Sequence, residues 1–599
     1  MGLSHVKKVN DIKDVPGATG AAVVRRQFVQ VGERRVLLRH AGSGPAVVLV
    51  HQSPQSSISL LPWFDLLAPR HAVFAPDTPG FGLSDPLALA QPTIPDLAAA
   101  LGRLLDALGL QRVLLYGVHT GAAIAARLAH DQPQRVAALV CDGLSAFTAA
   151  ERQPLLDGYL PPFEPSWDGT HLLWLWARMR EQTLYFPWHV GTAAARIPYP
   201  LATPADIHAS AMELLDAGDG YRAGYRSPLL YPHGAACAAR LAVPAWLLYR
   251  RTDVLRPHLD RLPTLPPQVQ AREVADAAAL QAAAASAFAA CAAQADTVDS
   301  DHCAARSPAV SRHITATAVG ELAWLVNSRD GRDGRNGASV ADASSVTAGP
   351  LLHLVLPDIG TPAALPADLP PQAWAIAIEL PGHGASAHIG APDIASGAWL
   401  DAVLAALPAL SGSPATRVHL HAVGASAAFA AQLALRLGSR CGGLTWTDPL
   451  ALDSDESAQL LATLPDLQTR ASGAHLIEAW NWARLRHLFK PWLAPTAAAA
   501  LAVAAPPPRR VHADSVEMLR AGPLLAALWQ AALAAPWPAL AAALLQHMPQ
   551  NTPLLLRAGS DLAQHRQAAR IAEWFGLQRD TDGPADGGTQ WSRRTLPPT

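Results

Sequence analysis

The residues best placed to do chemistry stand where an apolar run, 113–118, turns into an alanine-rich stretch, 122–129. The corner between them reads Gly117-Val-His119-Thr-Gly121. An apolar run, a Gly-x-x-x-Gly corner and an alanine-rich stretch predict a buried strand that turns sharply into a helix. In such a nucleophile elbow, a strained backbone exposes the middle side chain above the sheet. Here that side chain is His119, where a Ser, Cys or Asp would normally attack.

A histidine at this corner can act as a general base if a carboxylate orients its ring. Two carboxylates follow apolar runs, Asp253 after 243–249 and Asp142 after 136–141. Either could orient the imidazole. No histidine occurs in residues 273–281, where the last member of a Ser-Asp-His triad would fall, so a standard triad is not expected.

Two further stretches, together with the corner, resemble the α/β-hydrolase family. Residues 44–54, Gly-Pro-Ala-Val-Val-Leu-Val-His-Gln-Ser-Pro, are similar to its third strand and oxyanion loop. Residues 77–85, Asp-Thr-Pro-Gly-Phe-Gly-Leu-Ser-Asp, are similar to the turn after its fourth strand. The Gly-x-His-Thr-Gly elbow and the His-Gln-Ser-Pro loop resemble a bacterial subgroup of the family. The resemblance implies a carbonyl-binding role for His51, Gln52 and Thr120.

The motifs recur later in the chain. Gly44-Pro45 is echoed at 349–350, the segment 79–84 at 381–386, and the elbow with its helix, beginning at Arg112, from Arg417. Two later blocks recur in the same order. A repeat that preserves order and spacing predicts two tandem copies of one fold. The expected class is α/β: two α/β-hydrolase domains, each a mostly parallel sheet flanked by helices with a helical cap.

The predicted boundaries follow from this repeat. The first domain is expected over 20–300, with its cap at about 145–240. A linker is expected over 301–347, with a connecting helix around 320–326. The second domain is expected over 348–599, with its cap at about 450–548. In the first cap, a spacing of four predicts an aromatic and basic helical stripe of Trp176, Arg180, Leu184 and Trp188. We select Trp176 and Arg180 from this stripe, and His171 from the repeated block before it, as pocket residues.

The second domain has lost the elbow's chemistry. Gly424 stands at the middle position, which removes every functional side-chain atom there, and Leu356 replaces the oxyanion-loop histidine. Asp561 keeps the place of the acid. We therefore expect this domain to be inactive and to stabilise the first, in an arrangement like a dimer within one chain.

The composition limits the partners. The chain has 46 basic and 48 acidic residues among its 599 and no polybasic block, so nucleic acid is not expected as a partner. The uncharged stretch 524–545 is interrupted by Pro536 and Pro538, so no membrane span is expected there. Five cysteines without Cys-x-x-Cys spacing indicate buried thiols in the cytoplasm. No phosphate loop and no cluster with metal-ligand spacing occurs, so neither a cofactor nor a metal is expected.

Two functions remain open. In the first, the first domain hydrolyses a small acyl compound, an ester, thioester or lactone, with His119 as base and Asp253 or Asp142 as its partner. In the second, the chain is a non-catalytic tandem pseudohydrolase that binds a small molecule or a partner protein.

Overall fold

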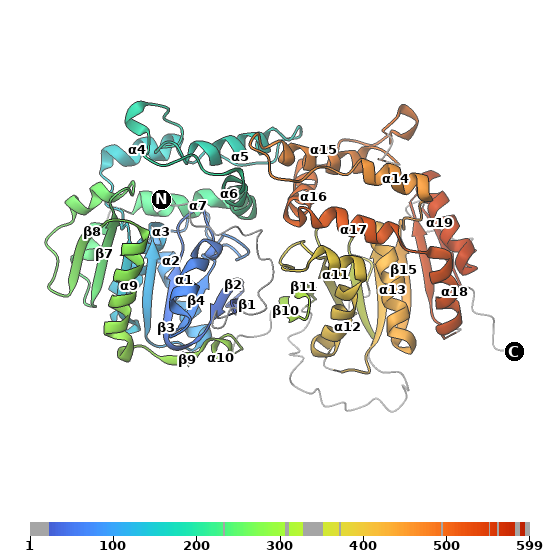
Figure 1. The fold of residues 1–599 in the computed structure, drawn as a ribbon, viewed down its shortest axis with the longest axis horizontal. Coiled ribbons are helices and arrows are strands. Elements are labelled where there is room, and N and C mark those ends of the chain that lie inside the picture. Colours follow the sequence, from blue (N-terminus) through green and yellow to red (C-terminus); the bar gives the residue numbers. More distant parts are fainter. Residues whose placement is uncertain are drawn as a thin grey trace. The chain divides into compact units, whose positions relative to one another are not determined.

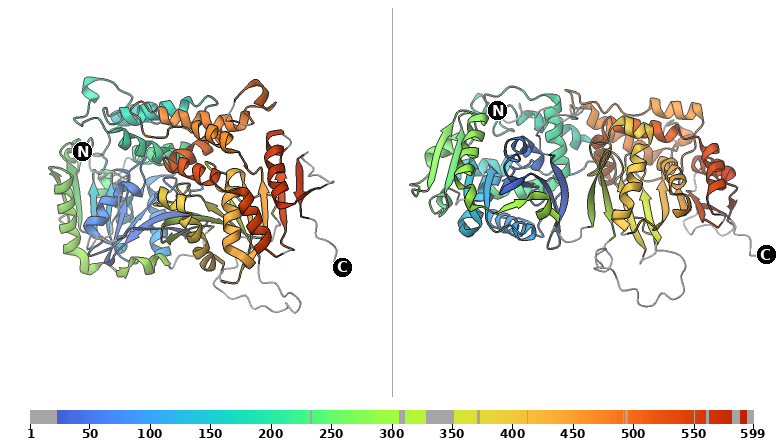
Figure 2. Two further views of the ribbon diagram at one scale, coloured as in Figure 1. Left: turned by 45° about the vertical axis from the view of Figure 1, so that its right-hand side comes forward. Right: turned by 60° about the horizontal axis from the view of Figure 1, so that its bottom comes forward.

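The structure, a computed structural model, describes residues 23–231, 234–305, 311–327, 351–369, 373–411, 413–490, 492, 495–549, 551–559, 562–580 and 588–593. The chain divides into two compact units. The first comprises Met1–Glu164 and His171–Val310, and the second Pro165–Thr170 and Ser311–Thr599. Each unit is built around one sheet (Figures 1 and 2).

The first sheet is mostly parallel. Its strand order is β1-β2-β4-β3-β5-β6-β7-β8, with β9 paired to β3. The strands β3 to β8 pair in parallel, whereas β1, β2 and β9 pair antiparallel. The bounds are β1 (Arg25–Val31), β2 (Arg34–Ala41), β3 (Ser43–Val50), β4 (Ala72–Pro76), β5 (Val113–Val118), β6 (Val136–Asp142), β7 (Ala245–Arg250), β8 (Val269–Val274) and β9 (Thr297–Asp299).

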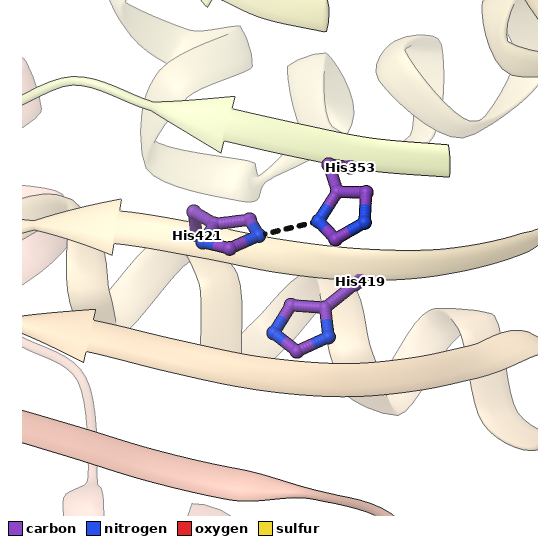
Figure 3. Close-up of side chains that lie close together, drawn as sticks. All are labelled: His353, His419 and His421. Atoms are coloured by element: carbon purple, nitrogen blue, oxygen red, sulfur yellow. Dashed lines mark hydrogen bonds between the residues drawn. The ribbon is translucent and has the colours of Figure 1, made fainter. Parts of the chain in front are cut away.

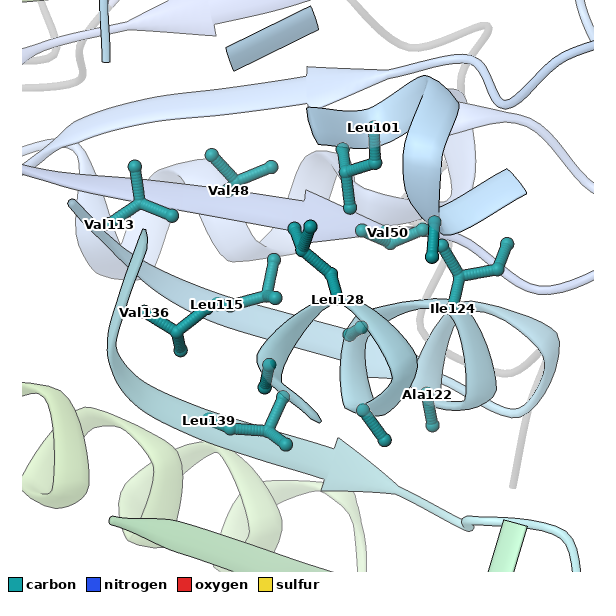
Figure 4. Close-up of a cluster of buried hydrophobic side chains, with 14 of the residues drawn as sticks. Val48, Val50, Leu101, Val113, Leu115, Ala122, Ile124, Leu128, Val136 and Leu139 are labelled. Atoms are coloured by element: carbon teal, nitrogen blue, oxygen red, sulfur yellow. The ribbon is translucent and has the colours of Figure 1, made fainter. Parts of the chain in front are cut away.

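Helices cover both faces of this sheet, because successive side chains of a strand point to opposite faces. Val48, Leu115 and Leu139 pack on one face with residues of α2 and α3 (Figure 4). Val47 and Leu114 pack on the other face with residues of α1 and α9. The helices are α1 (Leu61–Leu67), α2 (Ile94–Leu108), α3 (Thr120–Asp131), α8 (Gly234–Ala238), α9 (Ala277–Cys291) and α10 (Ser300–Ala305).

The segment between β6 and β7 is helical, and most of its helices lie at one end of the sheet's strands (Figure 1). These are α4 (Ala149–Gly158), α5 (Thr170–Glu181), α6 (Pro204–Ala217) and α7 (Tyr221–Leu230), whereas α8, which ends the segment, packs beside the sheet. Thr148 and Thr203 begin α4 and α6 with capping boxes, which explains where these helices start.

The second sheet has the order β10-β11-β13-β12-β14-β15-β16-β18-β17. The strands from β10 to β16 occupy the same places in this sheet as the strands from β1 to β7 occupy in the first. The strands are β10 (Arg312–Thr317), β11 (Gly320–Val326), β12 (Leu351–Leu356), β13 (Trp374–Glu379), β14 (Arg417–Val423), β15 (Cys441–Thr447), β16 (Leu554–Ala558), β17 (Gln578–Arg579) and β18 (Thr589–Ser592).

The second unit's helices also fall into two groups. Those beside the sheet are α11 (Ala391–Ser396), α12 (Ala398–Ser411), α13 (Ala427–Leu437) and α19 (Leu562–Phe575). Those between β15 and β16 are α14 (Ser454–Ala462), α15 (Ala474–Leu488), α16 (Pro508–Ala521), α17 (Leu524–Leu533) and α18 (Trp537–His547).

The structure corrects the predicted linker. The expected connecting helix at 320–326 is the strand β11, and β10 and β11 form an antiparallel pair at the edge of the second sheet. The apolar run of β11 is short and rich in buried residues, which suits a strand as well as a helix. The second unit therefore begins well before residue 348. The glycine-rich part of the predicted linker lies outside the described residues.

Two apolar segments are long enough to span a membrane by length and composition alone. The first is Ala277–Gln294, whose buried residues pack on the first sheet. The second is the pair α17 and α18, which is bent by 67° at the predicted proline break. The predicted burial of the cysteines is confirmed, since all five are buried thiols and none forms a disulfide within the described residues.

Candidate active site

The chain turns from β5 into α3 at His119, which has φ 47° and ψ −105°. The flanking glycines make this turn possible. A Cβ at Gly117 would lie 2.3 Å from the carbonyl oxygen of Gly121, and one at Gly121 would lie 2.2 Å from that of Val50. Strand, corner and helix therefore approach closely only because these positions lack a side chain. The corner leaves the His119 side chain 24% exposed.

His119 is held by Asp253. Its Nε2 lies 3.0 Å from Oδ2 and 3.1 Å from Oδ1 of Asp253. An ionised carboxylate only accepts, so Nε2 carries the proton and Nδ1 of the neutral ring carries the lone pair. Among the residues that the structure describes, none hydrogen-bonds to Nδ1. The pair is thus a carboxylate and an imidazole whose basic nitrogen is available to another molecule.

Neighbouring groups hold the carboxylate of Asp253 in place. Its Oδ1 accepts from the backbone N–H of Leu255 at 2.8 Å, and its Oδ2 accepts from Nη2 of Arg250 at 2.7 Å. Nε of Arg250 contacts Asp142 at 3.3 Å, and the hydroxyl of Tyr116 donates to Asp142 at 3.2 Å. Of the two carboxylates left open by the sequence, Asp253 is therefore the one in contact with the imidazole. Asp142 does not contact the ring nitrogens, and its negative charge acts on the imidazole from a distance.

The charges of this group shift several pKa values. Burial opposes charge on His119, but the attraction of Asp253 outweighs it, so the pKa of His119 is raised. Burial also works against the charge on Asp253, yet His119 and Arg250 hold its pKa well below the usual range. Burial raises the pKa of Asp142 despite Arg250. Asp253 therefore stays ionised, and His119 is a stronger base than a free imidazole.

Gly143 makes room for the imidazole. This residue follows β6 with φ +71°, and a Cβ there would lie 2.8 Å from Cδ2 of His119 and 3.1 Å from its Nε2. Any larger residue would push the ring away from Asp253. The glycine is therefore part of the geometry of the site, which the sequence analysis did not identify.

The predicted carbonyl-binding residues occupy different environments. His51 is buried, its Nδ1 contacts the carbonyl of Gln52 at 2.9 Å, and its Nε2 accepts from the backbone N–H of Thr78 at 2.8 Å. Both ring nitrogens are engaged, so His51 shapes the loop and offers no group to a substrate. The side chain of Gln52 bonds to Gln55, and Oγ1 of Thr120 lies 3.5 Å from the backbone N of Ser53.

The three predicted cap residues do not form one surface. His171 and Trp176 are buried, and the His171 ring lies 5.8 Å from that of Phe163. Arg180 is exposed and paired with Glu181, so it does not line an interior pocket. The predicted stripe fails because α5 ends at Glu181, before residues 184 and 188.

The buried arginine of this cap is Arg178, which is 1% exposed. Its guanidinium lies 5.2 to 6.0 Å from the rings of Tyr159, Trp188 and Tyr221. Nη1 donates to Gln182, whereas Nε and Nη2 have no partner among the described residues. The aromatic residues around 174–188 indicated that an arginine could be surrounded by aromatic rings. They did not indicate which arginine occupies this aromatic cage.

His258 is a further neighbour of the site, which the sequence did not indicate. It is buried, and its Nδ1 accepts from the backbone N–H of Ala146 at 2.9 Å. Burial lowers its pKa to about 4, and the charges of His119 and Asp253 act on it. It is therefore a neutral ring close enough for the charges of His119 and Asp253 to affect its pKa. Its place in the chain, shortly after Asp253, was a weak signal because no repeat or motif contains it.

The second unit's elbow is filled by a carboxylate. Gly424 has φ +58°, and a Cβ there would lie 2.3 Å from Oδ1 of Asp358. That oxygen accepts from the backbone N–H groups of Ile359 at 2.9 Å and Ala425 at 3.0 Å. Asp358 also forms an ion pair with Arg486, which lies 5.1 to 5.8 Å from the rings of Trp482, Trp492 and Trp529. Asp561 lies outside the described residues.

Comparisons with known proteins agree with this architecture. Residues 45–172 match the alpha/beta hydrolase fold family. An uncharacterized hydrolase of Saccharomyces cerevisiae is 29% identical over 148 residues, which are 24% of this chain and 50% of that protein. The dihydrolipoyllysine-residue acetyltransferase component of the acetoin cleaving system of Cupriavidus necator is 31% identical over 140 residues, 23% of this chain and 37% of that protein. The chain thus spans half or less of the length of these relatives.

Among solved structures, epoxide hydrolase A from Mycobacterium thermoresistibile is 23% identical, covers 46% of this chain and 100% of its own, and gives a TM-score of 0.33. The matched residues 45–172 hold β3, β4, β5, the elbow and β6, and they lie in a mostly parallel sheet flanked by helices. The chain therefore has the α/β-hydrolase fold.

Proposed function

We propose that the first unit is a hydrolase of small acyl compounds, an ester, thioester or lactone, in which Asp253 and His119 act as a general-base pair on water. The observation that carries this proposal is the contact between Nε2 of His119 and Asp253 at the elbow. In a Ser-Asp-His triad, the acid orients a histidine that is separate from the elbow residue. Here Asp253 binds the elbow residue, His119, directly. The nucleophile must then come from solvent.

The proposed hydrolysis needs no covalent intermediate with the protein. A water oxygen forms a bond to the carbonyl carbon while Nδ1 of His119 takes a proton from that water. The carbonyl oxygen becomes an oxyanion, and its collapse expels the alcohol or thiol, which receives the proton from Nδ1. Asp253 stabilises the imidazolium between these two transfers, as the low pKa of its carboxyl requires.

The oxyanion would be bound at the start of α3. The first backbone N–H groups of a helix have no partner within the helix and attract negative charge. The second unit supports this assignment, because the backbone N–H of Ala425, just after its elbow residue, already binds the carboxylate of Asp358. We assign the same role in the first unit to the backbone N–H of Thr120. The side chains of His51 and Gln52 then serve to shape the loop.

We further infer that the two units derive from a tandem duplication and that the second is not catalytic. The repeated motifs and the shared order of the first seven strands support the duplication. The lack of a side chain at Gly424 and the occupation of the elbow by Asp358 support the loss of activity. We also propose that the second unit stabilises the first, as the partner subunit of a dimer would.

The test is hydrolysis of a panel of activated esters, thioesters and lactones by the full chain and its His119→Gln variant. Removing the base is expected to lower kcat/KM by about a thousandfold, which corresponds to about 4 kcal/mol of barrier. His130→Gln is the matched control, because His130 lies on the surface at the end of α3 and pairs with Asp131. It should leave the rate unchanged.

Intact-protein mass spectrometry during turnover separates this mechanism from a covalent one. We expect no acyl adduct on the chain at any time. An adduct that accumulates with substrate would contradict attack by water. If the wild-type protein is silent on the whole panel but binds panel compounds at the first unit, the alternative of a tandem pseudohydrolase replaces this proposal.

A further inference from the structure

Three histidines of the second unit gather on one face of its sheet (Figure 3). His353 lies on β12, and His419 and His421 lie two residues apart on the adjacent parallel strand β14. Residues i and i+2 of a strand share a face, and His353 is the register partner of His419. The three rings therefore meet because of strand pairing, although His353 is far from the other two in the sequence.

The rings are in direct contact. Nδ1 of His353 and Nε2 of His421 are 2.8 Å apart, and the ring centroids of His419 and His421 are 4.6 Å apart. One nitrogen from each of the three residues can be chosen so that all lie within 4.8 Å of one another. The three side chains are half-buried, so small solutes can reach them.

The surroundings are built to hold His419. Its Nε2 lies 2.9 Å from Oγ1 of Thr445 on the next strand, β15. Gly443 pairs with His419 in register, and a Cβ at that position would lie 2.4 Å from its Nδ1. The glycine thus gives the ring its place, and the threonine fixes the ring's orientation.

The first unit shows that this face of the sheet does not need polar groups. There the register partners at the corresponding place of β3 and β5 are Val47 and Leu114, both fully buried. The elbow repeat aligns His419 with Leu114 and His421 with Tyr116. Three imidazoles thus stand where the related unit has two aliphatic side chains and a tyrosine, and packing alone does not explain them.

We propose that His353, His419 and His421 form a binding site for a divalent transition-metal ion, with Zn²⁺ as the best match. Imidazole nitrogen is a preferred ligand of zinc, copper and nickel. A zinc–nitrogen bond of about 2.0 to 2.1 Å places the nitrogens of a tetrahedral site about 3.3 Å apart. The observed separations, from 2.8 Å for the closest pair to at most 4.8 Å, bracket this value.

A neutral imidazole has a lone pair on one ring nitrogen, and this is the form in which histidine binds a metal. The ion pair of Asp368 and Arg557 adds opposing charges near His421. Three ligands leave a fourth position for water or another small ligand.

This site escaped the sequence analysis, which expected no metal because it looked for ligands at fixed linear spacing. The available signal was the alternation His419-Leu-His421 in a strand, which places two imidazoles on one face. The third ligand depends on the pairing of β12 with β14, which no local pattern gives.

The test is Co²⁺ and Zn²⁺ binding to the full chain, prepared without a histidine tag and freed of metal by a chelator. We expect one Co²⁺ per chain with the visible absorption of a four-coordinate ion, and its displacement by Zn²⁺. His421→Gln and His419→Asn should each weaken Zn²⁺ binding at least about a hundredfold, measured by competition with a chromogenic chelator. His130→Gln, in the first unit, should bind as the wild type does.

Two results would overturn the proposal. One is a wild-type chain that takes up no Co²⁺ or shows only the weak spectrum of a six-coordinate ion. The other is Zn²⁺ affinity that is equal in the wild type and in folded His421→Gln, with folding checked by circular dichroism. The wild-type spectrum decides the matter even where a variant fails to fold. The proposal concerns the second unit and stands independently of hydrolysis in the first.

Discussion

The two elbows of this chain share a backbone turn and differ in where the carboxylate sits. In the first unit, the elbow carries His119, and the carboxylate of Asp253 holds the outer edge of its ring. In the second, the elbow is Gly424, and the carboxylate of Asp358 lies over the corner itself, on the backbone N–H of Ala425. In the first unit, the imidazole of His119 lies beside the N-terminus of α3. In the second unit, the backbone N–H after the elbow binds the unit's own Asp358 side chain.

Each of the two carboxylates is paired with an arginine, but the two arginines have different surroundings. Arg250 binds Asp253 at Oδ2, the oxygen that also lies 3.0 Å from Nε2 of His119. Arg486, set among tryptophans, holds Asp358 in place over the elbow. The same backbone turn is thus compatible with two different residues at its middle position. The glycine avoids a strained side chain, and a carboxylate of the chain itself binds the backbone N–H group that follows it.

The largest effect is expected from Asp253→Asn. An amide at this position can no longer stabilise the imidazolium and favours the wrong tautomer of His119, so kcat should fall about a thousandfold. Because the attraction of Asp253 raises the pKa of His119, the rising limb of the pH–rate profile should also move to lower pH in this variant. Rates on the best substrate of the panel, measured across pH, check both expectations. Equal profiles in the two proteins would remove Asp253 from the mechanism.

The next effect compares the two caged arginines. Arg486→Met leaves Asp358 without its counter-charge, and we expect the second unit to lose about 2 kcal/mol of stability. Arg178→Met removes a buried guanidinium that has no acidic partner among the described residues, so the first unit should change by less than about 1 kcal/mol. Hydrogen exchange of peptides from each unit measures the two separately. Equal losses would show that the cage, rather than the carboxylate, stabilises Arg486.

Sequence patterns were sufficient for the fold and for part of the site. The apolar run ending at Val118 and the two glycines predicted the strand, the corner and the helix, since these depend on local sterics and periodicity. Asp253 was identified by its place after a strand. The choice between Asp253 and Asp142 was not predictable, because it depends on where Arg250 and Gly143 place the ring.

Other parts depended on distant contacts. The exposed position of Arg180 and the burial of Arg178 follow from where α5 ends, and the end of a helix is the least predictable of its features. The strand β11 was mistaken for a helix because a short apolar run fits both structures. The residues around Asp358 were overlooked because a carboxylate bound to backbone N–H groups at a glycine elbow belongs to no catalytic motif.

A smaller effect is expected from Gly143→Ala. The added Cβ would lie 2.8 Å from the His119 ring, and the residue would have to keep a φ of +71°, which costs about 1 to 2 kcal/mol for an L-residue. We expect a loss of about tenfold in kcat, with the ring displaced from Asp253. Gly218→Ala, which adds a Cβ at a similar φ with nothing within 4 Å, controls for backbone strain. A loss in activity of the same size in both variants would contradict a steric role for Gly143.

The smallest effect concerns stability against pH. Because the folded-state pKa of His119 lies above its unfolded value, its ion pair with Asp253 contributes stability that is fully present below the unfolded pKa of about 6.5. That contribution is lost as pH rises through the folded pKa. Wild-type peptides of β5 and α3 should therefore exchange relatively faster at high pH, after correction for intrinsic exchange, and His119→Gln should remove this dependence. Peptides of α13, which follows the glycine elbow, provide the internal comparison, because they contain no imidazole. A dependence that persists in His119→Gln would assign it to another group and leave the two elbows electrostatically more alike than their contacts indicate.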